Sequence, residues 1–163
     1  MRRFVVPLLL LVIFFLFPFQ VFIIGEETGI GIQGAVYRYQ ITGYGNSLIP
    51  VTQDIMYVIN GIYSGKTAFS ILLWALGTIL LTVTTWFGLV FADGSRPDFN
   101  CQVSFGLVGS CVCYLFSCIA QYGFFFHGPA GTSIPFGIGI VLVWLGILRF
   151  FPGIYLFLQE NAS

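Results

Sequence analysis

Charged residues are scarce in this chain of 163 residues, since Asp, Glu, Lys and Arg together make up 7% of it. Soluble domains carry about 25% charged residues, so the composition argues against an ordinary soluble protein. The six basic and six acidic residues balance, which leaves no basic surface for nucleic acid. His127 is the single histidine, and therefore one chain cannot form a metal site with several histidine ligands.

Long apolar runs with almost no charge are what the chain does contain. Four of them, residues 4–24, 68–91, 102–126 and 135–158, are long enough for helices that cross about 30 Å of hydrocarbon. The runs are continuous, whereas the strands of a membrane barrel alternate. The first run ends without a small-residue cleavage site, so we expect a retained span. We predict one domain (1–163), an all-α membrane protein built as an antiparallel four-helix transmembrane bundle.

The few basic residues set the predicted orientation. By the positive-inside rule the cytoplasmic side holds Arg2, Arg3, Arg96 and Arg149, and the outer side holds Arg38 and Lys66. We therefore predict an integral, multi-pass protein with both termini in the cytoplasm and the lipid bilayer as its surroundings.

Arg149 is the one charge inside an apolar run. Such a charge is costly unless it reaches the interface or pairs with an acid. We predict a structural ion pair of Arg149 with Asp93, at the inner end of the second run, or with Asp98 in the inner connection.

Residues 25–67 form a predicted extracytoplasmic cap between the first two spans. Its glycine-rich part at 29–34 is expected to be mobile. Residues 35–42 then alternate, with Tyr37, Tyr39 and Ile41 on one face, as in a half-buried strand. The rest of the predicted cap is a turn at 43–46, a return strand at 47–51 and a helix at 53–60. We expect this helix to pack on the β-hairpin, because an isolated hairpin is only marginally stable.

The third run contains a stripe of small residues. Its members recur at steps of four, three and four: Gly106, Ser110, Cys113 and Ser117. Helices in lipid pack closely through small residues, so this stripe predicts that the third helix is central to the bundle.

Four cysteines lie on or beside the third run: Cys101, Cys111, Cys113 and Cys118. On a helix Cys111 and Cys113 point about 200° apart, which prevents both from binding one metal ion. We interpret the cysteines as small packing residues.

Two short motifs resemble binding loops without completing them. Residues 42–45 read T-G-Y-G, like a potassium-channel filter that lacks its valine, but they follow a strand pattern where a pore helix is required. Residues 65–67 read G-K-T, yet Asn60 stands where a phosphate-binding loop needs glycine. We interpret both as turns or caps, and we predict no catalytic, cofactor-binding or metal site and no enzyme activity.

A long, β-patterned first outer loop and a short second one, at 127–134, are similar to the layout of claudin-type tetraspan proteins. The resemblance covers topology alone, because the W-GLW-C-C signature of claudins and the C-C-G of tetraspanins are both absent. We therefore assign the chain to neither family.

This layout favours a non-catalytic protein that acts in protein–protein interaction or assembly through its first outer loop, with a protein partner or a second copy. Tyrosine buries area at low entropic cost, and the predicted interaction surface comprises Tyr37, Tyr39, Tyr44, Tyr57 and Tyr63. The alternatives are an accessory subunit of a membrane enzyme or transporter complex and, less favoured, a small oligomeric channel or transporter.

Overall fold

The computed structural model describes residues 15–25, 29–90, 97–128, 130–135 and 137. Within these ranges the chain forms both strands and helices, so the prediction of an all-α four-helix bundle is wrong. The strands are β1 (Pro18–Ile24), β2 (Gly29–Gly34), β3 (Tyr37–Thr42), β4 (Gly45–Pro50), β5 (His127–Gly128) and β6 (Gly131–Ile134). The helices are α2 (Val51–Ile59), α3 (Gly65–Val90) and α4 (Pro97–Tyr122).

Of the membrane prediction, the structure supports two helical segments that could cross a bilayer. Two helical segments, Gly65–Phe87 and Phe105–Tyr122, are long and apolar enough to cross a membrane. The tetraspan description is not supported, because the described residues hold two such segments beside a sheet. Most of the predicted fourth span lies outside the described residues, as do both partners of the predicted Arg149–Asp93 pair.

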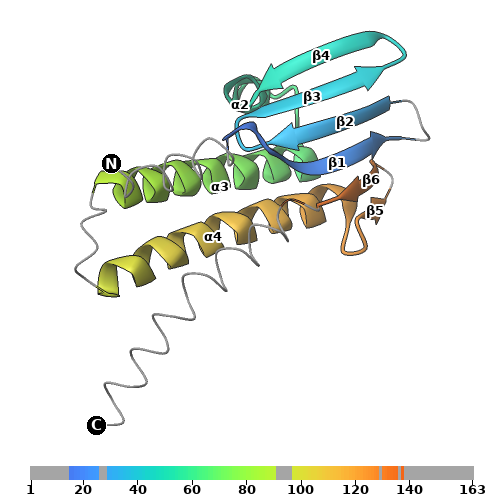
Figure 1. The fold of residues 1–163 in the computed structure, drawn as a ribbon. Coiled ribbons are helices and arrows are strands. Elements are labelled where there is room, and N and C mark those ends of the chain that lie inside the picture. The colour runs from blue at the N-terminus through green and yellow to red at the C-terminus, as the bar shows by residue number, and fades with distance from the viewer. Residues whose placement is uncertain (1–14, 26–28, 91–96, 129, 136, 138–163) are drawn as a thin grey trace.

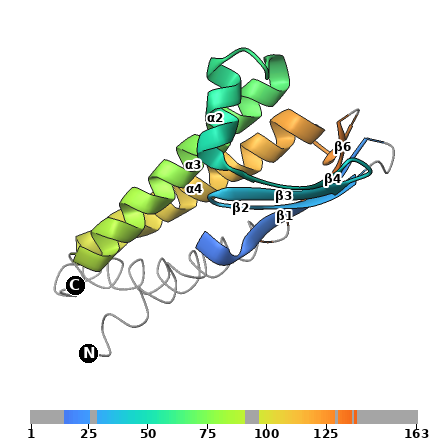
Figure 2. The same ribbon diagram turned by 90° about the horizontal axis from the view of Figure 1, so that it is seen from above.

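The six strands form one antiparallel sheet in the order β4-β3-β2-β1-β6-β5. Strands β1 to β4 follow one another as hairpins, whereas β6 comes from the segment after α4 and pairs with β1. Val21 stands opposite Ile32 of β2 on one side and Ile134 of β6 on the other. The sheet therefore joins two parts of the chain that lie on opposite sides of the helix pair in sequence (Figures 1 and 2).

Strand β1 corrects the prediction of a helical first span over residues 4–24. Pro18 lacks a backbone donor and disfavours the helical conformation of the residue before it. The residues after it are β-branched, aromatic or amide-bearing, and they find strands to pair with on both sides. The glycine-rich stretch predicted to be mobile is strand β2, and the predicted turn at 127–134 contains the β5–β6 hairpin.

Helices α3 and α4 lie antiparallel, and the sheet lies over the half of the pair that contains the start of α3 and the end of α4 (Figures 1 and 2). Trp74 of α3 is buried against Tyr114 of α4, with ring centroids 4.5 Å apart, and Phe19 of β1 stacks on Tyr114 at 5.0 Å. Gly77 leaves room for the Tyr114 ring, because a Cβ at this position would lie 2.8 Å from it. These aromatic rings form the centre of the core.

Trp74 and Thr78 also fix the sheet to the helices by hydrogen bonds. The indole Nε1–H of Trp74 lies 3.0 Å from the carbonyl oxygen of Gly34 and 3.2 Å from that of Ala35. The hydroxyl of Thr78 donates to the Ala35 carbonyl at 2.6 Å. The β2–β3 turn is thereby held against the middle of α3.

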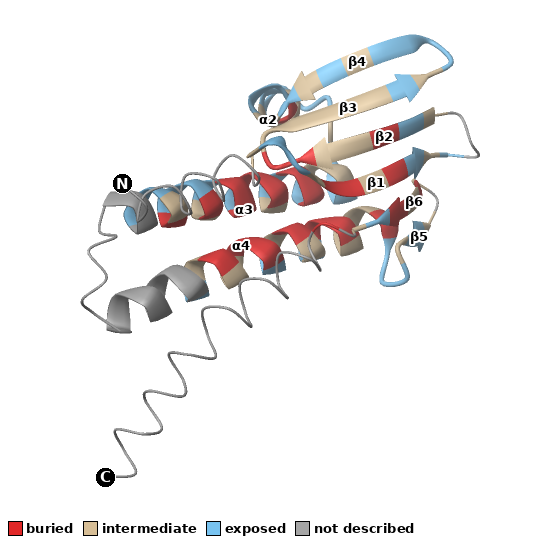
Figure 3. Ribbon diagram, in the orientation of Figure 1, coloured by how far each residue is buried: buried red, intermediate tan, exposed pale blue. Residues whose placement is uncertain are grey.

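The sheet turns its polar face towards the helices and its apolar face outwards. Inward-facing residues include Gln20, Gln33 and Arg38, which lie opposite one another in the register. The outward face carries isoleucines and Leu48, and exposure increases from β1 towards β4 (Figure 3). In a soluble protein the sheet usually has its apolar face towards the core and its polar face towards water.

Candidate functional site

Gln20 connects four elements in the polar layer between the sheet and the helices. A bulge between Pro18 and Gln20 interrupts the alternation of β1, so that Phe19 and Gln20 are both buried. The amide nitrogen of Gln20 donates to Gln33 Oε1 of β2 at 2.7 Å. Its oxygen accepts from Cys118 Sγ of α4 at 2.7 Å and from Ser133 Oγ of β6 at 3.0 Å. Gln20 thus joins β1, β2, β6 and α4 through its side-chain hydrogen bonds.

Arg38 and Asp54 form the second polar contact of this layer. Arg38 extends from β3, and its Nη2 lies 2.5 Å from Oδ1 of Asp54 in the first turn of α2. Asp54 is the one buried residue of α2. Burial raises the pKa of Asp54 above its ordinary value of 3.8, and the neighbouring Arg38 guanidinium opposes this shift without cancelling it.

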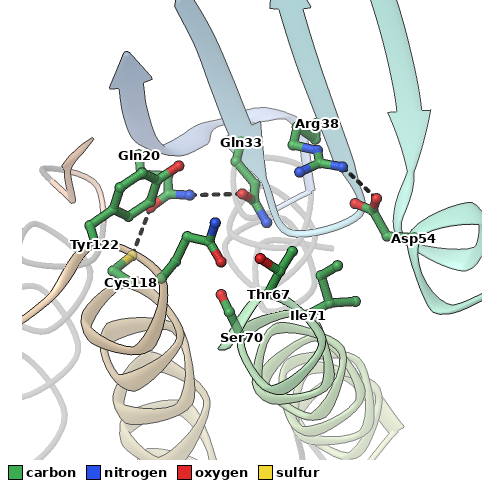
Figure 4. Close-up of a pocket in the computed structure, with 10 residues that line it drawn as sticks. Gln20, Gln33, Arg38, Asp54, Thr67, Ser70, Ile71, Cys118 and Tyr122 are labelled. Atoms are coloured by element: carbon green, nitrogen blue, oxygen red, sulfur yellow. Dashed lines mark hydrogen bonds and ion pairs between the residues drawn. The ribbon is translucent and has the colours of Figure 1, made fainter. Parts of the chain in front are cut away.

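A cavity lies between these residues and the first turns of α3 (Figure 4). It has a volume of about 30 Å³ and is mostly polar, with Gln20, Gln33, Arg38, Asp54, Ser70 and Gln121 among the residues that line it. Figure 4 shows the inward-pointing side chains of Gln20, Gln33 and Arg38 from three adjacent strands above Ser70 of α3.

A larger groove of about 390 Å³ adjoins this cavity. The two share Arg38, Thr67, Gln121 and Tyr122. The groove adds a mixed lining of sheet and loop residues: Phe22, Ile24, Gln40, Thr42, Tyr44 and Tyr63. Its volume falls in the range of small-molecule sites, about 300–1,000 Å³.

Two buried polar atoms at the junction of cavity and groove have no hydrogen-bond partner among the described residues. They are the Nε of Arg38, a donor, and the Oε1 of Gln121, an acceptor. Buried polar groups are nearly always paired in folded proteins, so two unpaired atoms at one junction are a feature of the site.

The five predicted surface tyrosines do not form one surface. Tyr39 lies on the outward face of the sheet, and the hydroxyl of Tyr37 donates to the Leu16 carbonyl at 2.9 Å. Tyr44 is fully exposed in the β3–β4 turn. Tyr57 and Tyr63 meet edge to face with centroids 5.5 Å apart, and Tyr63 also lines the groove.

The predicted small-residue stripe lies partly at the α3–α4 contact. Ser110 and Ser117 are buried, and Ser117 exchanges hydrogen bonds with Ser70, its hydroxyl lying 2.7 Å from the Ser70 carbonyl. A Cβ at Gly106 would come within 2.2 Å of the Thr84 hydroxyl, so α3 approaches α4 closely there. Cys113 is only half-buried.

The motifs interpreted as turns have ordinary structural places. Residues 43–46 include the β3–β4 turn, and Gly65 begins α3 with a φ of 57°. His127 Nδ1 lies 2.7 Å from the Thr132 hydroxyl within the β5–β6 hairpin. The described residues contain no group of three or more His, Cys, Asp or Glu side chains that could hold a metal ion.

Sequence reasoning missed the polar layer. It used Arg38 to set the orientation and did not connect Arg38 with Asp54 of the predicted helix at 53–60. A signal was present in the alternation of β3, whose second face carries Arg38, Gln40 and Thr42. Gln20 offered another signal, since it is a polar residue near the end of the apolar run at 4–24.

Comparison of the chain with protein-family models, with curated proteins and with solved structures gives no match. The chain's own geometry is therefore the basis on which its function is inferred.

Proposed function

We propose that this chain is a non-catalytic, multi-pass membrane protein that assembles with a second copy of itself through the outward face of its sheet. In this proposal the sheet lies on the extracytoplasmic side and both termini are cytoplasmic. The observation that carries the proposal is the contiguous apolar surface of the sheet, which is exposed in the single chain.

The helix pair supports the membrane part of the proposal. Large apolar side chains at steps of three and four are exposed along α3: Phe69, Leu72, Leu76, Ile79, Val83 and Trp86. The side of α3 that meets the sheet and α4 instead buries hydroxyl groups, among them Ser70, Thr78 and Thr84. An apolar exterior over an interior of small and polar residues is typical of helices in lipid.

The outward face of the sheet supports the assembly part. Two adjacent rows of apolar residues cross it, in the order of the register: Ile134, Val21, Ile32, Tyr39 and Leu48 in one, and Ile23, Ile30 and Ile41 in the other. We call these eight residues the outer apolar face. Leu48 is 66% exposed, Ile134 61% and Ile30 50%. Contiguous apolar surface of this kind marks interaction sites.

A second copy is the occupant that fits this face. None of its eight residues is charged, so the face is electrostatically compatible with itself, and sheets pack face to face about 10 Å apart. Lipid alone is a poor occupant because β4 is an edge strand with outward N–H and C=O groups, which need water or protein. A two-fold contact would bury the same surface on both copies.

The experiment measures the mass of the full chain in mild detergent for the wild type and two lysine variants. Leu48→Lys places a charge within the outer apolar face. Ile59→Lys is the matched control, because Ile59 is 71% exposed but lies on α2 and is not part of the outer apolar face. We expect a wild-type oligomer, a dissociation constant at least about tenfold higher for Leu48→Lys, and no change for Ile59→Lys.

Three results would contradict the proposal. They are a monomeric wild type at every protein concentration, an oligomer that Leu48→Lys leaves intact, or equal weakening by both lysines. A wild type that co-purifies in fixed proportion with a different protein, and not with itself, would replace the second copy by an accessory-subunit role.

A further inference from the structure

The groove and the polar cavity beneath it have features that assembly through the outer apolar face does not use. They lie on the opposite, inward side of the sheet, between β3, the start of α3 and the end of α4. The geometry points to a binding site for a neutral polyhydroxylated group, the chemistry of a glycosyl ring, with one hydroxyl in the cavity between Arg38 and Gln121.

The unpaired atoms define the hydrogen bonds that a ligand must make. The Nε–H of Arg38 needs an acceptor, and the Oε1 of Gln121 needs a donor. A carboxylate or an unprotonated phosphate offers acceptors only, and an ammonium group offers donors only. A hydroxyl offers one donor and two acceptor lone pairs, so hydroxyl groups can satisfy both atoms.

The size of the cavity agrees with this choice. Its volume of about 30 Å³ is above the minimum of about 10–15 Å³ that holds one water molecule, and it leaves room for little more than one or two groups of that size. The group that enters it is therefore about the size of a hydroxyl. The adjoining groove, at about 390 Å³, has room for the ring that bears this hydroxyl.

The charge of the site favours a neutral ligand. Arg38 is the one basic residue of the lining, and its charge is offset by Asp54 at 2.5 Å. An anion on the free Nε–H would share the guanidinium with the Asp54 carboxylate on Nη2, and the two negative charges would repel one another. The groove also offers neutral hydrogen-bonding groups, among them the amide of Gln40 and the hydroxyls of Thr42 and Thr67.

Aromatic rings supply the remaining part of a sugar site. Phe22, Tyr44, Tyr63 and Tyr122 line the groove, and the C–H faces of a pyranose pack on such apolar surfaces. Phe22 and Tyr122 also lie near one another, with centroids 6.5 Å apart. The glycosyl ring can belong to a membrane glycolipid or to a free saccharide, and the experiment separates these two sources.

The test uses the full chain in lauryl dimethylamine oxide, because detergents with maltosyl headgroups would compete for the site. Three probes are added in turn: monogalactosyl diacylglycerol, lactose and the anionic lipid phosphatidylglycerol. Binding is followed by native mass spectrometry and by the shift in thermal unfolding. We expect the galactolipid to bind better than phosphatidylglycerol. Binding of lactose as well would identify the ring alone as sufficient, and its failure would identify the lipid headgroup as the source.

Gln121→Leu is the decisive variant, since it removes the unpaired acceptor and leaves the Arg38–Asp54 pair in place. We expect at least about fivefold weaker binding together with unchanged or higher stability of the unliganded protein, because a buried unpaired oxygen is removed. A residue that only supports the fold would give the opposite result, with stability lost. Gln53→Leu, an exposed glutamine on α2, is the control and should not change binding.

Gln40→Leu, on the sheet side of the groove, carries the same test if Gln121→Leu does not fold. The proposal is overturned if the wild type binds neither galactosyl probe or if phosphatidylglycerol binds as tightly as the galactolipid. Equal binding by the wild type and by both groove variants would also overturn it.

Discussion

Arg38 of β3 and Asp54 of α2 form an ion pair of 2.5 Å, and only 5% of the Asp54 side chain is exposed. The pair joins the sheet to the short helix that follows it, on the side that faces the groove. Removing one partner of a buried pair leaves the other charge buried without compensation. The resulting loss of stability is larger than the net stability that the intact pair contributes.

We therefore expect Arg38→Met to lower the free energy of unfolding by about 3 kcal/mol. The double variant Arg38→Met/Asp54→Leu should recover most of this loss, because no buried charge remains. Urea unfolding in mild detergent measures both. A double variant as unstable as Arg38→Met would show that the guanidinium stem, and not the lone carboxylate, accounts for the effect.

The pH dependence of stability should include a contribution from Asp54. Its pKa is raised by burial in the folded state, so the folded protein holds this proton more tightly than the unfolded chain. The resulting stability is fully present below the unfolded value of 3.8 and is lost as pH rises through the raised pKa. As the pH rises from 3.8 through the raised pKa, Asp54→Asn should therefore lose less unfolding free energy than the wild type. Identical pH profiles for the two proteins would contradict the assignment.

Gly31 of β2 should tolerate no side chain. A Cβ there would lie 2.3 Å from the Phe22 ring and 2.8 Å from the Tyr39 carbonyl. We expect Gly31→Ala to lower the unfolding free energy by about 1–3 kcal/mol, as overpacking does. Gly43→Ala is the control, since a Cβ at Gly43 would meet no atom within 4 Å. Thermal unfolding of both variants measures the effect. Equal shifts of the melting temperature in Gly31→Ala and Gly43→Ala would argue against close packing of Phe22 over Gly31.

Trp74→Phe should loosen the sheet from α3. It keeps most of the buried ring but removes the indole donor to Gly34 and Ala35, at a cost of about 1–2 kcal/mol. Hydrogen exchange should then increase at residues 34–36. Trp86→Phe is the matched control, because Trp86 lies on the same helix and is 65% exposed. Unchanged protection of the β2–β3 turn in Trp74→Phe would contradict this role.

Local patterns predicted the parts of the fold that depend on near neighbours. The alternation around Tyr37–Thr42 and the turn after it predicted the β3–β4 hairpin, and apolar length predicted α3 and α4. Strand β1 was missed because its sequence, PFQVFII, continues an apolar run that also suits a helix. Its pairing with β6 spans more than a hundred residues, and no local pattern reports such a contact.

The site was harder to predict, because its orientation inverts a familiar rule. The two faces of β3 were assigned from alternation, but an apolar face is ordinarily expected to point inwards. Here Arg38 and Gln40 point inwards, and Ile41 is 45% exposed. Whether a polar face meets water or a polar interior depends on the surroundings of the whole molecule, which the pattern of one strand does not contain.

The pairing of β1 with β6 also has a consequence for the order in which the protein is made. Strands β1 to β4 leave the ribosome first and can pair as successive hairpins, whereas β6 follows only after both long helices. During that interval β1 has one edge with free N–H and C=O groups, beside an apolar surface. Nascent chains with such edges are prone to pair with one another. Slow completion of α3 and α4 should therefore lower the yield of this protein, because it prolongs the interval in which nascent chains can pair.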